Sequence, residues 1–277
     1  MAGSLLFSAR RFAGVYRQVF VLGVQNTLVY RWNFLLRAVV SVLPLVSTYF
    51  LWGAAFAGRG TVGGYTYAQM MTYYFSLVVL DSFTSPTEDD FQIAADIRDG
   101  RINQVLLKPL NYFLYRFVLF ASSRLVYVAV AAVPLAIFVV YLRHFFAGIP
   151  FARTLAPAAL AFLGSALVQF SFSYMVGLIA FWLLDVGSIV FMLFSLEFLI
   201  GGHVFPLDFL PEPWHHLVMA TPFAYEYFFP VAVLLGRVSG AALWWGFAWQ
   251  AAWAAGLIGL SAALWKLGLK KYTAVGG

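Results

Sequence analysis

The sequence predicts an all-α integral membrane protein with six transmembrane helices. Of its 277 residues, 63% are hydrophobic and only 10% are charged, and the mean hydropathy is +0.86. Soluble domains carry about a quarter charged residues. The charges are clustered and leave uncharged runs of about the 20 residues that an apolar helix needs to cross a bilayer. This composition excludes a water-soluble enzyme. The formal net charge of +6 is typical of the basic cytoplasmic segments of membrane proteins and does not indicate a nucleic-acid partner.

Residues 1–33 predict a cytoplasmic or interfacial helix before the first span. A base-rich amphipathic helix is suited to lying in the headgroup plane of a bilayer. The alternative is an ordinary polar lead-in to the first span. On a helical wheel, one sector holds Arg10, Arg17, Gln18, Gln25 and Arg31, and the opposite sector holds Phe12, Val15, Tyr16, Val19 and Leu22.

Six stretches with few or no charges are the candidate transmembrane helices. Pro44 within the first is tolerable, because neighbouring helices can satisfy the carbonyl that it frees. The fourth is longer than one straight helix needs, which indicates a tilted span. The predicted spans cover about residues 38–58, 65–84, 125–142 with an extension towards 117, 154–184, 186–200 and 238–265.

Residues 201–236 predict a helical pair that re-enters the membrane from the outer side between spans five and six. Glu197 interrupts the fifth apolar stretch, and Gly201 and Gly202 end it. Prolines at this density exclude one long helix, and irregular backbone at membrane depth must be buried in protein. The prolines that follow the glycine pair are Pro206, Pro211, Pro213, Pro222 and Pro230.

The distribution of basic residues predicts the orientation. Five bases precede the first span, five lie between the second and third, and three follow the sixth, so thirteen of the seventeen fall on one side. Cytoplasmic loops are enriched in Lys and Arg. The N- and C-termini and the loop from 85 to 124 are therefore expected in the cytoplasm.

Several chemistries have no candidate residues in this chain. No glycine-rich loop has the lysine of a nucleotide-binding P-loop, and no serine lies in a nucleophile-elbow motif. The chain has no cysteine, which excludes disulfides and thiolate ligands. His215 and His216 are adjacent and are expected to point apart on a helix, so we expect no metal site. No catalytic, cofactor-binding or metal-binding residue is predicted.

The stretch from 85 to 112 is the longest charge-dense loop. Thr87, followed by acidic residues, marks a helix start. Gly100 is expected to stop that helix in a left-handed conformation, and Pro109 to end a second helix over 102–108. The two helices are expected to present Ile97, Leu106 and Leu107 between charged residues. The alternative from physics alone is an interfacial helix pair that lies on the inner leaflet.

The run IRDGRINQVLLKPL within this loop resembles the signature of the ABC type-2 exporter permeases. One subgroup of that family carries Ile-Arg-acid-Gly, a few variable residues, and then Leu-Leu-base-Pro-Leu. The stretch PFAYEYFFP at 222–230 and the ending GLKKYTAVGG also agree with the subgroup, and the resemblance covers the whole chain. The residues that match the loop signature are Ile97, Arg98, Asp99, Gly100, Leu106, Leu107, Lys108, Pro109 and Leu110.

The resemblance implies that residues 1–277 form a single transmembrane permease domain. Such a chain dimerises with an identical or a different permease chain and sits on two separate ABC ATPase subunits. ATP and Mg²⁺ would belong to those subunits, so this chain would hold no cofactor although its complex hydrolyses ATP. The complex would export an amphiphilic or bulky substrate across the lipid of a bacterial cytoplasmic (inner) membrane.

In the same family, a cytoplasmic coupling helix between the second and third spans docks into a groove on the ATPase. By position, this helix would be about 88–100 within the coupling loop 85–116, with Asp96 and Arg98 as candidates for ion pairs to the partner. The coupling residues that the resemblance implies are Asp96, Ile97, Arg98, Asp99, Gly100, Leu106, Leu107 and Pro109.

Glu197 is the acidic residue whose position most needs explaining, because a carboxylate at membrane depth is costly. It is expected to line the translocation path or hold the bend at Gly201 and Gly202, or to bond to the broken backbone there. A proton- or ion-coupled secondary transporter that uses Glu197 and Asp81 is the alternative function. Such carriers usually contain paired broken helices, and no second broken helix is evident in the sequence. A membrane scaffold without transport is a third hypothesis.

Overall fold

The computed structural model describes residues 2–29, 36, 40, 42–84, 88–108, 110–146, 148–183 and 186–272. This part of the chain is helical, with no strand and only an isolated antiparallel bridge between Val62 and Tyr65. The predicted all-α class is therefore confirmed.

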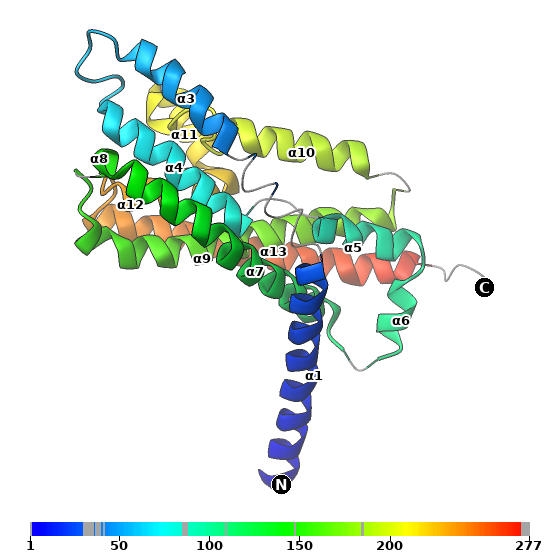
Figure 1. Ribbon diagram of the computed structural model, residues 1–277. Coiled ribbons are helices and arrows are strands. Elements are labelled where there is room, and N and C mark those ends of the chain that lie inside the picture. Colours follow the sequence, from blue (N-terminus) through cyan, green and yellow to red (C-terminus); the bar gives the residue numbers. More distant parts are fainter. Residues whose placement is uncertain are drawn as a thin grey trace.

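The body of the molecule is a bundle of helices that run side by side, with α9 in contact with α4, α7 and α13 (Figure 1). The helix boundaries lie within a few residues of the predicted spans, except that α7 starts earlier than expected and α13 continues past the predicted end at 265 to Lys271. The helices are α3 (Val42–Ala55), α4 (Tyr67–Thr84), α7 (Tyr112–Tyr141), α9 (Phe151–Gly177), α10 (Gly187–Ile200) and α13 (Gly240–Lys271). A short helix α8 (Arg143–Phe146) follows α7, and a 3-10 turn η1 (Leu178–Phe181) extends α9.

The early start of α7 has a local cause. The side chain of Asn111 accepts a hydrogen bond from the backbone N–H of Leu114 at 3.0 Å, which is an N-cap. The prediction followed hydropathy and therefore began the span where the charges stop. The more polar first turns of α7 are helical as well, because they pack against other helices instead of lipid.

Three helices in the described residues are long and apolar enough to cross a membrane: Tyr112–Tyr141, Phe151–Phe181 and Gly240–Lys271. A bent pair of helices between α10 and α13 would make a fourth if it counts as one span. The 14-residue helices α3 and α10 are apolar but shorter. The chain is thus a multi-pass membrane protein, and the layout of six spans stays a prediction.

The N-terminal stretch forms one helix, α1 (Ala2–Val29), which runs transverse to the bundle (Figure 1). It packs on α7 through the buried residues Tyr16, Val19 and Thr27. Gly23 lies in the same stripe, and a side chain there would overlap Ser122 of α7. Residues 30–33 of the predicted segment lie outside the described residues. A helix is confirmed here, and its location in the headgroup plane stays a prediction.

The segment 201–236 is broken, as its prolines predict. A helix pair within it is bent by 84°. Gln250 of α13 holds this segment, because its amide donates to the carbonyls of Tyr225 and Ala161, each at 2.9 Å. Its elements are η2 (Leu207–Phe209), α11 (Glu212–Met219), the π-helical turn η3 (Ala224–Phe228) and α12 (Phe229–Leu234).

At the end of the bundle near α8, the loop after α3 is tied to this broken segment. The Tyr65 hydroxyl donates to Asp208 at 2.8 Å, and Arg237 pairs with the same carboxylate at 3.1 Å. The Arg237 guanidinium lies 3.8 Å from the centre of the Tyr65 ring. Burial, followed by the Asp208 charge, raises the pKa of Tyr65, so this phenol stays protonated and donates. Asp208 is therefore engaged within the chain.

Candidate functional site

The charge-dense loop folds into two short helices, α5 (Glu88–Arg98) and α6 (Ile102–Leu106). Gly100 lies between them with a φ of 72°, a conformation that side chains other than glycine disfavour. The predicted helix pair and its left-handed glycine joint are confirmed. The second helix ends at Leu106, two residues earlier than predicted. Pro109 lies outside the described residues.

One face of α5 is buried against the adjacent ends of α9 and η1. Ile93, Ala94 and Ile97 form this face, and Ile97 is only 3% exposed. Gly177 at the end of α9 permits the close approach, since a Cβ there would lie 2.8 Å from the Cβ of Ile93. The prediction that Ile97 is presented on the surface is wrong. An apolar face on a short helix is buried where a neighbouring helix can pack closely against it, and Gly177 allows α9 to do so.

Asp96 turns towards α7 and anchors α5 there. Its carboxylate accepts from the Tyr112 hydroxyl at 3.0 Å and forms an ion pair with the Arg116 guanidinium. The Arg116 side chain is 5% exposed, and its Nε donates to the Tyr112 hydroxyl at 3.1 Å. Arg101 approaches the other carboxylate oxygen at 3.8 Å. Asp96, a candidate for contact with a partner protein, is thus bonded within this chain.

The joint and the end of α6 face outwards. Arg98 pairs with Asp99 at 3.0 Å, and Arg101 pairs with the same carboxylate at 2.9 Å. The hydrogen bond from Arg98, assisted by Arg101, holds the pKa of the Asp99 carboxyl below its usual range. Leu106 is also exposed, and Leu107 is 88% exposed. The outward side of this unit thus carries two apolar side chains next to charged residues.

The anchor of α5 is continuous with the long helices. The Tyr112 ring stacks on Trp265 of α13, with ring centres 5.1 Å apart. The backbone N–H of Asn111 donates to the Tyr16 hydroxyl of α1 at 3.1 Å. In Figure 1, α5 lies at the end of the bundle where α13 ends. A displacement of α5 would therefore act on α1, α7, α9 and α13 together.

Arg116, Tyr112 and Gly177 were not among the predicted site residues. Tyr112 and Arg116 are four residues apart, so they share one face of a helix. Arg116 is also a base that adjoins an apolar run, and both features could have drawn attention to it. Gly177 carries no such signal, because a glycine in an apolar helix is compatible with many surroundings.

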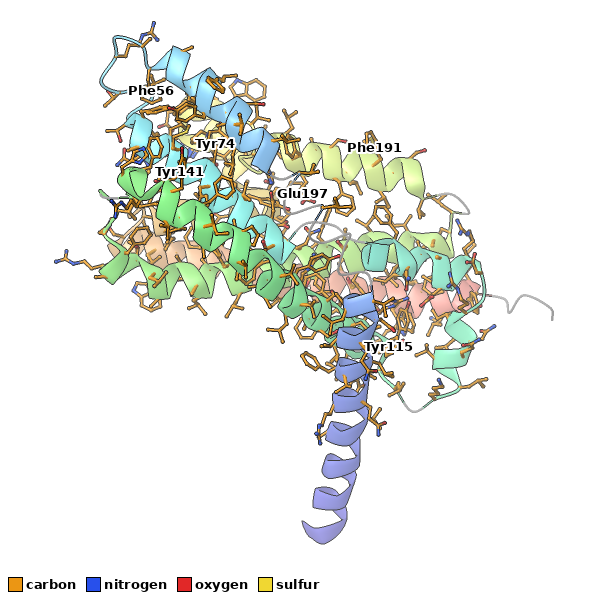
Figure 2. The ribbon with its side chains drawn as sticks, in the orientation of Figure 1. Phe56, Tyr74, Tyr115, Tyr141, Phe191 and Glu197 are labelled. Carbon is orange, nitrogen blue, oxygen red and sulfur yellow. The ribbon has the colours of Figure 1, made fainter. Side chains whose placement is uncertain are left out.

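The second predicted group lies at the C-terminal end of α10, where Figure 2 labels Glu197. Glu197 is buried, and its carboxylate accepts from the Tyr227 hydroxyl of η3 at 2.8 Å. The backbone N–H of Gly201 donates to the Glu197 carbonyl at 2.7 Å. Gly202 has a φ of 105°, and its carbonyl accepts from the Tyr73 hydroxyl at 2.6 Å. These contacts bring all three residues together at the bend, and the Glu197 side chain joins α10 to the broken segment.

One group of side chains in the described residues could hold a metal ion. Glu212, His215 and His216 on the first turns of α11 have ligand atoms within 4.8 Å of one another. The two histidines therefore do not diverge as far as their adjacent positions suggest. Glu212 and His216 already form an exposed pair at 2.9 Å, which needs no metal.

Comparison with known families adds one finding. The family described as ABC-2 family transporter protein matches residues 42–276. No curated protein matches the chain.

Proposed function

The chain belongs to the ABC-2 transporter family, and we propose that it is the transmembrane permease subunit of an ATP-driven exporter. It dimerises with an identical or a different permease chain and is driven by separate ATPase subunits, which hold the ATP and Mg²⁺. ATP hydrolysis takes place on those subunits. Its cargo is amphiphilic or bulky, and it moves outwards across a bacterial cytoplasmic membrane.

The α5–α6 unit carries this proposal. It is fixed to the long helices by Ile93 and Asp96, and it exposes Leu106, Leu107 and the Arg98–Asp99 pair on its other side. A relay between a partner and the spans needs both properties. We assign the outward side to ATPase docking. Asp96 and Ile97 are then the inward attachment, and Gly100 sets the angle between the two helices.

In this mechanism, the ATPase subunits push on Leu106 and Leu107 when they close on ATP. The displacement passes to α7 through the Asp96–Arg116 pair and to α9 through the contact of Ile93 with Gly177. Packed cores respond to such shifts by switching between discrete arrangements rather than by continuous deformation. The Glu197–Tyr227 bond would transmit the movement of α10 to the outer segment.

The six crossings of this proposal are α3, α4, α7, α9, α10 with its broken continuation, and α13. α10 has 14 residues and spans about 21 Å at 1.5 Å per residue, which is less than the hydrocarbon core of about 30 Å. The segment 201–236 completes that crossing and returns to the outer side. Both termini and the loop 85–116 are then cytoplasmic. The sequence-based alternative of an ion-coupled carrier is not favoured, since the family is that of ATP-driven transporters.

Docking is tested with the full chain, expressed together with the ATPase encoded nearest to it. Truncating an anchor residue in an interface commonly costs about 2 kcal/mol, so we expect Leu106→Ala with Leu107→Ala to weaken the complex at least about tenfold. Co-purification in detergent and ATP hydrolysis provide the readouts. Leu155→Ala, at an exposed leucine of α9, is the control and should behave as wild type. Equal recovery of the ATPase with both variants would contradict the docking surface. A chain that binds no ATPase at all would contradict the proposed function.

A further inference from the structure

A cavity of about 640 Å³ lies between α3, α4 and α7 and beside the C-terminal end of α10. This volume is within the range of about 300–1,000 Å³ that is typical of small-molecule sites. The cavity is separate from the α5–α6 unit, since none of the residues that line it belongs to that unit.

The walls of the cavity are mainly apolar and aromatic. Trp52 of α3 and Tyr74 of α4 form one wall, with ring centres 6.2 Å apart, and Figure 2 labels Tyr74. Tyr74 is held in place because its hydroxyl donates to the carbonyl of Val204 at 2.7 Å. Tyr127 and Phe138 of α7 also line the space. Aromatic faces attract cations as well as apolar groups.

One acidic side chain opens into this space. Asp81 lines the cavity, and its side chain is 34% exposed. The apolar residues Leu77 and Val78 of the same helix line the cavity beside it. Its partner is His203, whose Nε2 lies 3.3 Å from one carboxylate oxygen. The His203 ring is itself stacked on Phe198, with ring centres 4.7 Å apart. Asp81 therefore keeps part of its carboxylate accessible to a ligand.

The basic residue of the cavity is less accessible than Asp81. The Arg124 guanidinium lies 4.6 Å from the centre of the Phe120 ring and 5.6 Å from that of Tyr127. Its side chain is buried. The accessible charge in the cavity is thus negative, and it is surrounded by aromatic rings.

We propose that this cavity binds lipophilic cations, with Asp81 as the counter-charge and the rings of Trp52, Tyr74 and Tyr127 around the apolar body. A carboxylate on a mainly apolar wall is costly unless a partner or a ligand faces it. A cation with its own apolar surface would both neutralise the Asp81 carboxylate and fill the apolar cavity. The inference that this cation is the cargo of the exporter rests on the proposed function. The inference that the cavity binds it does not.

The test uses the full chain in detergent and two probes of one shape and opposite charge, tetraphenylphosphonium and tetraphenylborate. Binding of radiolabelled tetraphenylphosphonium is measured by scintillation proximity without ATP or an ATPase. We expect saturable binding of tetraphenylphosphonium and no comparable binding of radiolabelled tetraphenylborate, which is measured in a separate sample because the two ions associate with each other. Removing one charge of a desolvated pair typically costs about 2 kcal/mol or more, so Asp81→Asn should raise the Kd at least about tenfold.

Three variants complete the test. Asp81→Glu retains the charge and should bind nearly as wild type, and Ser195→Ala, at an exposed residue of α10 outside the cavity, should change nothing. Ala131→Trp fills the cavity from α7 and should abolish binding; size-exclusion profiles verify that each variant is folded. Wild-type affinity in Asp81→Asn, or equal binding of tetraphenylborate in its own sample, would overturn the proposal. Because no ATPase takes part, such a failure leaves the exporter function intact. A chain that binds the cation but recruits no ATPase would refute the exporter function alone.

Discussion

Replacing Asp96 by alanine is expected to uncouple ATP hydrolysis from transport. The change removes one partner of a pair in which Arg116 is 5% exposed, and leaving a buried charge without its partner costs about 3–5 kcal/mol. The 13% exposure of Asp96 favours the lower end of this range. Without this ion pair, a displacement of α5 would no longer move the transmembrane helices with it. We expect substrate transport in proteoliposomes to fall at least about tenfold per ATP hydrolysed, with the ATPase still bound.

Glu212→Ala is the matched control for this prediction, because the Glu212–His216 pair of α11 is exposed and exposed pairs contribute only about 0–1 kcal/mol. Asp96→Leu combined with Arg116→Leu removes both charges and should restore the melting temperature of the complex, since an apolar pair can replace a buried ion pair. If transport per ATP is unchanged in Asp96→Ala, the anchor does not transmit movement.

The features that the sequence predicted well are those that backbone chemistry decides locally. Gly100 and Gly202 end helices in left-handed conformations, which few other residues tolerate. The prolines after Gly202 interrupt the helix wherever they occur. Long uncharged runs such as 154–184 became long helices for the same kind of reason. Each of these outcomes depends on residues close together in the chain.

The orientation of the coupling residues depended instead on distant contacts. Ile97 and Asp96 are adjacent on a short helix, and the sequence alone leaves open which of its sides is covered. The covering groups are Gly177 and Arg116, both many residues away in the chain. Hydropathy also misjudged the start of α7, because a buried arginine beside a carboxylate counts as polar on any scale although it packs inside the protein.

Together, these contacts separate two roles within one short loop. A relay requires an inward side that is rigid and an outward side that is accessible. In this loop the inward side is Asp96 with Ile93, and the outward side is Leu106 with Leu107. Substitutions on the outward side should therefore change ATPase affinity. Substitutions on the inward side should change the transport obtained from each ATP at unchanged affinity.

Replacing Gly177 by leucine is expected to displace α5 and to abolish most of the ATP-driven transport. A Cβ at this position would lie 2.8 Å from Ile93 Cβ, and Ile93 is buried on a helix that Asp96 also holds in place, so the contact cannot relax through a flexible side chain. Overpacking of this kind typically costs about 1–3 kcal/mol. The measurement is transport by the assembled complex in proteoliposomes, with ATP hydrolysis recorded in parallel.

Gly256→Leu in α13 is the control, because the structure leaves open space around that glycine. Both substitutions raise helix propensity by about 1 kcal/mol, so a difference between them isolates the contact with Ile93. Combining Gly177→Leu with Ile93→Ala makes room for the new side chain and should recover part of the transport. Normal transport by Gly177→Leu would mean that the contact of α5 with α9 does not transmit the movement. Transmission would then depend on the path through Asp96 and α7.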